Sequence, residues 1–217
     1  INYFIEIMNQ KNGKNSLGLD SCFEDLENPI DLFKKWFAKA KDNEINDPNA
    51  LALATSDNTN QPSVRMVLLK DITDKGFVFY TNFESRKSIE LKKNQKASMC
   101  FHWKSLRRQV RIIGKVEQVT DKEADEYFSS RPYKNRIGAW ASSQSKVLDK
   151  RENFLKKIKE FERKYSDKNN VPRPPHWSGW RVLPSEVEFW LDAEGRVHER
   201  LNYKIKSGKW IKELLYP

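Results

Sequence analysis

The sequence places five short strand-like segments one after another between residues 50 and 119. Each is rich in β-branched, aromatic or alternating apolar residues and is bounded by turn-forming residues or a short helix-like stretch. The segments are Ala50 to Ser56, Ser63 to Asp71, Phe77 to Thr81, Ala97 to Trp103 and Gln109 to Val119. We expect the first three to form a meander and the whole set to belong to an α+β fold built on a small β-barrel.

Four stretches predict helices around this sheet. Pro29 to Lys41 has apolar residues three and four positions apart and lysines on its other side, and Glu84 to Asn94 is also helix-like. Thr120 begins a capping box, which predicts a helix to about Ser130. A longer helix from about Leu148 is predicted by a stripe of core-packing residues, Phe154, Ile158, Phe161 and Tyr165.

Three further strands are predicted at the C-terminal end, namely Arg181 to Leu191, Arg196 to Ile205 and Lys209 to Leu214. Arg196, His198 and Arg200 follow the two-residue period of a strand, which places the three side chains on one face about 6 to 7 Å apart. Such a face could span a phosphorylated ring and its cofactor, with the nearby Trp190 as a flat wall. From spacing alone, the exposed polar face of an edge strand is the more ordinary explanation.

Positive charge is concentrated in one part of the chain. Of the net charge of +10, the thirty residues from Arg86 to Lys115 contribute +9, with ten Lys or Arg against the single acid Glu90. Three explanations stay open, namely a nucleic-acid footprint, a site for small phosphorylated ligands and a solvated basic face. Arg86 and Lys87 follow Ser85 at a predicted helix start, where backbone N–H groups also attract phosphate.

Another pair of cations, Arg65 and Lys70, flanks the apolar run Met66 to Leu69. The two positions differ in parity, so a regular strand points their side chains to opposite faces. One ligand reaches both only at the end of the strand, around a bulge or across a subunit interface. These three geometries stay open.

Several mechanisms lack the motifs that they require. The sequence has no Gly-rich dinucleotide or P-loop motif and no nucleophile elbow, and its histidines and cysteines lack metal-ligand spacing, so we expect no metal. No apolar run approaches the roughly 20 residues that cross a bilayer, and two isolated cysteines favour a reducing compartment. We expect a cytoplasmic protein without a membrane span, with one domain over residues 29–217 after a variable N-terminal segment, residues 1–28.

Nine short blocks of the sequence together carry a family pattern. They are Arg65 to Lys70, Phe79 to Asn82, Ser85 to Lys87, Arg108 to Val110, Tyr127 to Pro132, Ile137 to Trp140, Gln144 and Ser145, Glu188 to Trp190, and Arg196 to Arg200. In this order, from Asp47 to the C-terminus, the chain resembles the pyridoxamine 5′-phosphate oxidase family. The resemblance implies a split β-barrel homodimer with two FMN sites at the interface, each built from both subunits.

The resemblance also implies the residues of the site. FMN would contact Arg65, Met66, Val67, Leu68, Leu69, Lys70, Tyr80, Thr81, Arg86, Lys87, Gln109, Gln144, Ser145, Trp190 and Arg200. The phosphorylated substrate would contact Lys70, Tyr127, Arg131, Asn135, Arg196 and His198. Of these, Arg196 and His198 would lie beside the reacting carbon as catalytic residues.

The implied reaction is the oxidation of pyridoxamine 5′-phosphate or pyridoxine 5′-phosphate to pyridoxal 5′-phosphate. A hydride moves from the 4′ carbon of the substrate to FMN, and oxygen then reoxidises the flavin with release of hydrogen peroxide. Two departures from the family pattern bear on the substrate. Asn135 replaces a common Ser, and Asn12 and Asn15 lie roughly where the family has an Arg-x-x-Tyr segment that closes over the substrate.

Two other hypotheses stay open. The first is a flavin-binding split-barrel relative that acts on another substrate or merely carries flavin, and Tyr127, Arg131, Arg196 and His198 argue against it. The second is an RNA- or DNA-binding module that uses the basic segment, which predicts steeply salt-dependent binding and no chromophore. The family resemblance leads us to expect no nucleic-acid partner.

Overall fold

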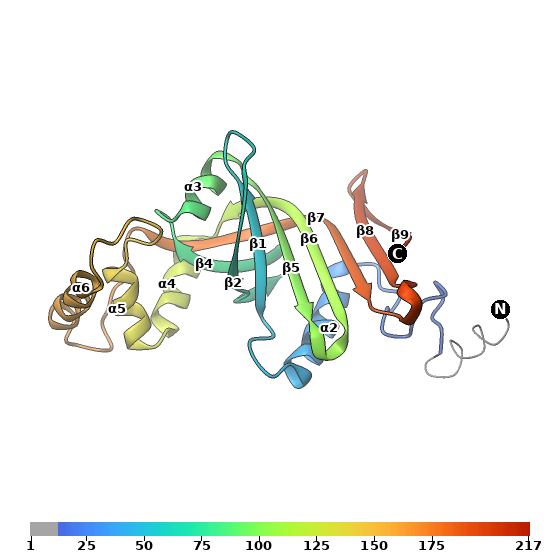
Figure 1. Ribbon diagram of the computed structural model, residues 1–217, viewed down its shortest axis with the longest axis horizontal. Coiled ribbons are helices and arrows are strands. Elements are labelled where there is room, and N and C mark those ends of the chain that lie inside the picture. The colour runs from blue at the N-terminus through green and yellow to red at the C-terminus, as the bar shows by residue number, and fades with distance from the viewer. Residues whose placement is uncertain (1–12) are drawn as a thin grey trace.

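The computed structural model describes residues 13–217 (Figure 1). Its helices are α2 (Pro29–Asn43), α3 (Arg86–Lys93), α4 (Asp121–Ser130), α5 (Tyr133–Ala141) and α6 (Arg151–Lys164), with short 3-10 turns η1 (Lys104–Leu106) and η2 (Glu194–Arg196). Its strands are β1 (Ala50–Ser56), β2 (Pro62–Leu68), β3 (Asp71–Thr73), β4 (Gly76–Asn82), β5 (Lys96–Trp103), β6 (Arg108–Gln118), β7 (Trp177–Leu191), β8 (Glu199–Lys206) and β9 (Lys209–Leu214).

All the strands of the described part belong to one antiparallel sheet. Their order is β2-β1-β5-β6-β7-β4-β3, with β8 paired to β7 and β9 to β8. Figure 1 shows the sheet strongly curled, with β8 and β9 standing away from the barrel at one end. The hairpin of β1 and β2 agrees with the prediction, but the predicted meander ends there. β4 pairs with β3, because the turn before Gly76 folds the two strands into a hairpin. On its other edge, β4 pairs with β7 and not with β2.

A bulge interrupts the long central pair of β6 and β7. The register shifts between Ile113 and Gly114, so that Ser185 is paired with no β6 residue in the register, although its hydroxyl donates to the carbonyl of Ile113 at 3.2 Å. Pro184, which has no backbone N–H, is tolerated inside β7 at this point. A Cβ on Gly114 would lie 2.0 Å from the carbonyl oxygen of Leu183, so the close approach of the two backbones at the bulge requires glycine here.

The main core lies between α2 and the concave side of the sheet. Phe33 of α2 is fully buried, with ring centroids 4.8 Å from Phe77, 5.0 Å from Phe101 and 5.7 Å from Trp103. The amphipathic pattern of this helix predicted such a face, and Asn28 caps the helix by accepting a hydrogen bond from the backbone N–H of residue 30. The predicted helix is therefore confirmed and ends two residues later than expected.

Replacing Phe33 with Ala is expected to lower the free energy of unfolding by about 3 to 5 kcal/mol, because a cavity would remain between three aromatic rings. For a chain of this size that corresponds to a fall in Tm of about 10 °C. Ile45, which is 91% exposed, offers a control, and Ile45→Ala should change the free energy by less than about 0.5 kcal/mol. Urea titrations of the three proteins would measure both, and equal midpoints would contradict the core assignment.

The segment before α2 also packs on the core. Phe23 is fully buried, and its ring lies 5.2 Å from that of Trp36. Asn15 accepts hydrogen bonds from the backbone N–H groups of Leu17 and Leu19, so its side chain is used within its own turn. Asn12, the other residue expected near the lid position, lies outside the described residues.

Helices α4, α5 and α6 gather at the end of the molecule opposite β8 and β9 (Figure 1). They enclose a second apolar cluster that includes Phe128, Ile137 and Trp177. No pattern in the sequence predicted α5, since it begins directly after Pro132 and carries a glycine. The α6 stripe was predicted as core, but its rings are only half-buried, against Trp140 and the cavity described below. Within residues 13–217, no helix combines the length and apolar character needed to span a membrane.

Candidate functional site

A cavity of about 1080 Å³ lies between the curled sheet and the helices α4 to α6. One wall comes from β2, β4 and the start of α3, and the other comes from α4, α5 and the loop that follows α5. The predicted site residues that line it are Arg65, Met66, Val67, Leu68, Lys70, Tyr80, Thr81, Arg86, Lys87, Tyr127, Arg131, Asn135, Gln144 and Ser145. Segments more than 60 residues apart in sequence therefore meet here, as the family resemblance implied.

Arg65 and Lys70 can face the same cavity, despite their different parity, because β2 ends between them. The strand ends at Leu68, and Lys70 lies in the link to β3, where its backbone N–H bonds to the carbonyl of Val78. Both side chains can therefore face the same cavity. The side chain of Leu69 instead lies in the main core, so this residue differs from its predicted neighbours in where it points.

Aromatic rings form the wall of the cavity on the helix side. Tyr80 stacks on Tyr127 with ring centroids 4.1 Å apart and on Trp177 at 5.4 Å. A Cβ at residue 179 would come within 2.8 Å of the Tyr80 ring, so Gly179 permits this stack. Trp177 was missed by the sequence prediction, which began this strand at Arg181. The alternation of Trp177, Gly179 and Arg181 continues the period of the strand and could have revealed it.

Arg131 is a half-buried cation within this aromatic wall. Its guanidinium lies 4.7 Å from the ring centre of Trp177, and no ion-pair partner is found for it among the described residues. Its Nη1 atom is buried without a hydrogen-bond partner. Burial lowers the pKa of Arg131 from its ordinary value, but the group remains charged. A cation whose buried donor atom is unused in a cavity wall is suited to an anionic ligand.

Lys87 is held on the opposite side of the cavity, in the first turn of α3. Its Nζ donates to Thr81 Oγ1 at 2.9 Å, Ser85 Oγ at 3.1 Å and Gln144 Oε1 at 3.0 Å. None of these acceptors carries a negative charge. Burial, together with the nearby charge of Arg65, lowers the pKa of Lys87 to about 8. The ammonium would therefore gain from an anion beside it.

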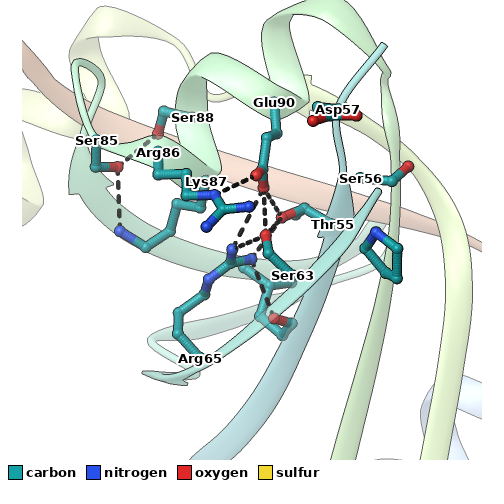
Figure 2. A network of polar contacts seen from close by, with 12 residues as sticks. Thr55, Ser56, Asp57, Ser63, Arg65, Ser85, Arg86, Lys87, Ser88 and Glu90 are labelled. Atoms are coloured by element: carbon teal, nitrogen blue, oxygen red, sulfur yellow. Dashed lines mark hydrogen bonds and ion pairs between the residues drawn. The ribbon is translucent and has the colours of Figure 1, made fainter. Parts of the chain in front are cut away.

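Arg65 and Arg86 reach the same region from β2 and α3. Figure 2 shows both guanidinium groups next to the buried carboxylate of Glu90. Arg86 and the first turn of α3 present both a side-chain cation and backbone N–H groups to the cavity. Glu90 was not predicted as a site residue, and its place as the single acid of the basic segment was the signal that could have indicated a special role.

The remaining predicted residues form a second cluster, which does not line this cavity. Gln109, Trp190 and Arg200 lie side by side on three neighbouring strands, because Gln109 pairs with Trp190 and Trp190 pairs with Arg200. The ring of His198 lies 4.6 Å from that of Trp190. Trp177 of the cavity and Trp190 of this cluster are thirteen residues apart on β7, which is roughly 40 Å along a strand. The two clusters are therefore too far apart within one chain to contact the same small ligand.

The prediction that Arg196, His198 and Arg200 share one face of a strand is wrong. β8 begins only at Glu199, and Arg196 belongs to the turn η2. Gly195 and Arg196 both have a positive φ, 66° and 61°, which a strand does not permit. The alternation of charged residues imitated a strand, while Gly195 was the residue that allowed the turn.

Acidic groups hold the side chains of the second cluster. Arg200 donates from Nε to Glu188 Oε1 at 2.9 Å and from Nη1 to the carbonyl of Tyr216 at 2.7 Å. His198 Nδ1 lies 3.1 Å from Asp192 Oδ1, to which it can donate when it is protonated. When it is unprotonated, the same nitrogen can instead accept the backbone N–H of Ala193 at 3.2 Å. Within residues 13–217, no three His, Cys, Asp or Glu side chains are grouped so that they could hold a metal ion.

Comparisons with known proteins identify the family. Residues 37–165 match the family model described as pyridoxamine 5′-phosphate oxidase, and residues 177–217 match the one described as the pyridoxine 5′-phosphate oxidase C-terminal dimerisation region. The chain belongs to the pyridoxamine 5′-phosphate oxidase family. The second match covers β7 to β9, and so it includes Trp190, Arg196, His198 and Arg200.

Curated relatives of this family match nearly the whole chain. The pyridoxine/pyridoxamine 5′-phosphate oxidase of Pelagibacter ubique is 63% identical over 207 residues, which cover 95% of this chain and 100% of that protein. The protein of the same name from Bartonella quintana is 52% identical and covers 94% of this chain and 99% of its own length.

Solved structures agree with the curled sheet. PhzG from Burkholderia lata, in complex with tetrahydrophenazine-1-carboxylic acid, superposes with a TM-score of 0.86 at 31% identity, covering 94% of this chain and all of its own. An FMN-binding protein from Nostoc punctiforme, related to pyridoxamine 5′-phosphate oxidase, gives a TM-score of 0.68 at 16% identity, with 85% and 97% covered. The predicted α+β split β-barrel of this oxidase family is confirmed.

Proposed function

We propose that this chain oxidises pyridoxamine 5′-phosphate or pyridoxine 5′-phosphate to pyridoxal 5′-phosphate with FMN as cofactor and oxygen as the final acceptor. The observation that carries the proposal is an aromatic-walled cavity with separate cationic groups on its two sides. Arg86 and Lys87 lie on α3, and Arg131 directly follows the last residue of α4. Two phosphate groups, one of the cofactor and one of the substrate, match this arrangement.

The residues present fit FMN. Lys87 donates hydrogen bonds only to neutral acceptors. Within residues 13–217, Arg86 bonds to Glu90 through Nε and makes no protein hydrogen bond through its terminal nitrogens. The polar side chains of Thr81, Gln144 and Ser145 line the cavity nearby. When bound, FMN supplies a ring that accepts the hydride. Lys87 and Arg86 would hold the cofactor phosphate, and the segment Arg65 to Lys70 would contact the flavin.

The substrate is held by a different set of residues in this proposal. Arg131 and Lys70 bind its phosphate as cations, and Tyr127 and Asn135 orient it by stacking and hydrogen bonding. With FMN bound, the 4′ carbon of the substrate would lose a hydride and its amine or hydroxyl group a proton, and oxygen would take up the two electrons and two protons as hydrogen peroxide. For the amine substrate, water would then hydrolyse the resulting imine and release ammonia. The stacked rings of Tyr80 and Tyr127 would shield one side of the substrate from solvent.

The two clusters meet across a homodimer. Because Gln109, Trp190, Arg196, His198 and Arg200 lie far along the sheet from the cavity, they complete the site of the partner subunit. The dimerisation match over residues 177–217 contains four of these five residues and supports this arrangement. Arg196 and His198 of the partner subunit would then hold the reacting end of the substrate close to the flavin.

The direct test is to purify the protein, record its visible spectrum and supply pyridoxamine 5′-phosphate in air. We expect a flavin spectrum and equal amounts of pyridoxal 5′-phosphate and hydrogen peroxide. Bound flavin without peroxide formation would instead favour a relative that acts on another substrate. A colourless monomer that ignores added FMN would refute the proposal.

The nucleic-acid alternative loses its main support in the fold. The basic segment is divided between α3 and η1, at opposite ends of the eight-residue β5 and so roughly 25 Å apart. Acids from elsewhere in the sequence also pair with it, since Arg107 binds Asp192 and Arg111 binds Glu188. Within residues 13–217, the cations of this segment are therefore divided between two places and do not form one continuous face.

The affinity for FMN is expected to fall as the pH rises above about 8. The pKa of Lys87 in the free protein is about 8, and a phosphate dianion beside it raises that pKa, so FMN binding takes up a proton above this pH. Affinity should be level below pH 8 and decline by up to about tenfold per pH unit above it. Flavin fluorescence titrations from about pH 7 to about pH 9.5 would measure the slope.

Lys87→Arg provides the matched control for this prediction, because an arginine stays protonated throughout the range. Its affinity for FMN should not decline between these pH values. Riboflavin, which lacks the phosphate, should also show no decline with the unmodified protein. The same slope in all three titrations would show that Lys87 is not the group responsible.

A further inference from the structure

Glu90 is a buried acid inside the most basic part of the chain. Only 4% of the residue is exposed, and both oxygens of its carboxylate are used. Oε2 accepts hydrogen bonds from Thr55, Ser63 (2.7 Å) and Arg65 (3.3 Å), while Oε1 accepts one from Arg86 Nε at 2.8 Å. Figure 2 shows the carboxylate between β1, β2 and α3 with these groups directed at it.

The hydrogen bonds keep this acid ionised. Burial alone would raise the pKa of Glu90, but the bonds from Ser63, Thr55 and Arg86 and the charge of Arg65 outweigh it, so its pKa lies below the ordinary value. Three donors fix Oε2 in place, which leaves Oε1 for a single partner. The orientation of Oε1 is therefore set by Thr55, Ser63 and Arg65, which lie on β1 and β2, whereas Arg86 lies on α3.

The two arginines differ in what they leave available. Both terminal nitrogens of Arg65 are committed to the protein, because Nη1 donates to Leu53 O (3.2 Å) and Thr55 Oγ1, and Nη2 donates to Ser63 and Glu90. Arg86 gives only its Nε to Glu90, and its side chain is 60% exposed. The Nη1 and Nη2 groups of Arg86 are therefore the guanidinium donors that remain for a ligand in the cavity.

We propose that Glu90 is a positioning residue for the binding of the cofactor phosphate. Its carboxylate holds Arg86 through Nε, so that both terminal nitrogens of Arg86 face the phosphate. Arg65 acts as the buried counter-ion that keeps Glu90 in place and makes no bidentate contact with the ligand. The inference rests on the proposed FMN function. It adds a residue that does not touch the cofactor and separates the roles of two arginines that sequence treats alike.

An electrostatic effect and a positioning effect of Glu90 predict opposite changes in FMN affinity when its carboxylate is removed. Glu90→Gln removes one negative charge close to the expected phosphate dianion, so electrostatics alone would strengthen FMN binding. If Glu90 acts by positioning, the amide turns an N–H toward the donors or holds Arg86 less firmly, and FMN binding weakens. The sign of the change therefore distinguishes the two.

The experiment compares FMN with riboflavin, which has the same ring and no phosphate. Dissociation constants would be measured by flavin fluorescence for the unmodified protein, Glu90→Gln and Glu90→Asp. We expect both variants to weaken FMN binding by about 10- to 100-fold relative to riboflavin binding, which is the range for a charge-assisted hydrogen bond. Glu117→Gln is the control, since Glu117 pairs with Arg181 outside the cavity, and it should leave the ratio unchanged.

Each outcome decides the matter. An unchanged ratio, tighter FMN binding, or an equal loss for both flavins in Glu90→Gln would overturn the positioning role. If Glu90→Gln does not fold, Glu90→Asp, which keeps the charge but shortens the reach to Arg86, decides by the same ratio. If the unmodified protein binds neither flavin, the proposed function itself fails, which is distinguishable from failure of this inference.

Discussion

Replacing Arg196 with Ala is expected to lower kcat for pyridoxamine 5′-phosphate by at least about 100-fold while the Kd for FMN changes by less than about threefold. The reason is the place of Arg196 in the turn η2, in the cluster away from the cationic side of the cavity. A group that holds the reacting end of a substrate acts on the chemical step, and cofactor retention depends on other cations. Steady-state assays with saturating FMN and flavin titrations would measure the two quantities.

Arg86→Ala is the matched comparison. It removes the free guanidinium at the start of α3, so FMN binding should weaken by about 10- to 100-fold, while kcat at saturating FMN recovers to near its original value. Equal loss of flavin from both variants would contradict this division of roles. So would an Arg196→Ala enzyme that turns over normally.

A heterodimer of an Arg86→Ala chain with an Arg196→Ala chain is expected to regain about half of the original activity, although each variant alone is nearly inactive at limiting FMN. In the proposed dimer, each site takes Arg86 from one subunit and Arg196 from the other. In the heterodimer, one site receives both substitutions and the other receives neither, so one site of two is intact. Two different affinity tags and co-expression would isolate the mixed species, whose peroxide production can then be assayed.

The control carries both substitutions in one chain and pairs it with an unmodified chain. If sites are shared between subunits, each site of this dimer has one defect, and the activity should stay low. If each site were built within a single chain, this second dimer would be half active and the first inactive. Which of the two mixed dimers is half active therefore depends on whether the sites are shared between subunits or built within one chain.

The secondary structure was predictable where local pattern and burial agree. The helix at Pro29–Asn43 and the strands at Ala50–Ser56 and Lys209–Leu214 follow from their periodicity, because one face of each meets the core or a neighbouring strand. The pairing of β4 with β7 was not predictable in this way. It joins residues about one hundred positions apart, and no local signal specifies such a partner.

The site shows the same division. Arg65, Lys87 and Arg131 were identified through the family pattern, and the structure brings them to one cavity. Arg196 and His198 were also identified, but the strand assigned to them was wrong because Gly195 begins a left-handed turn. Glu90 was missed, since its importance arises from contacts with β1 and β2 that become visible only when the sheet has curled.

The stack of Trp177 on Tyr80 has a practical consequence. Tryptophan emits light at wavelengths that flavins absorb, so a bound flavin would quench the emission of an indole ring that lines its own cavity. Occupancy could then be followed from intrinsic fluorescence during purification, without a label or a substrate. The chain has seven tryptophans, and comparison with a Trp177→Phe variant would isolate the signal of this one reporter.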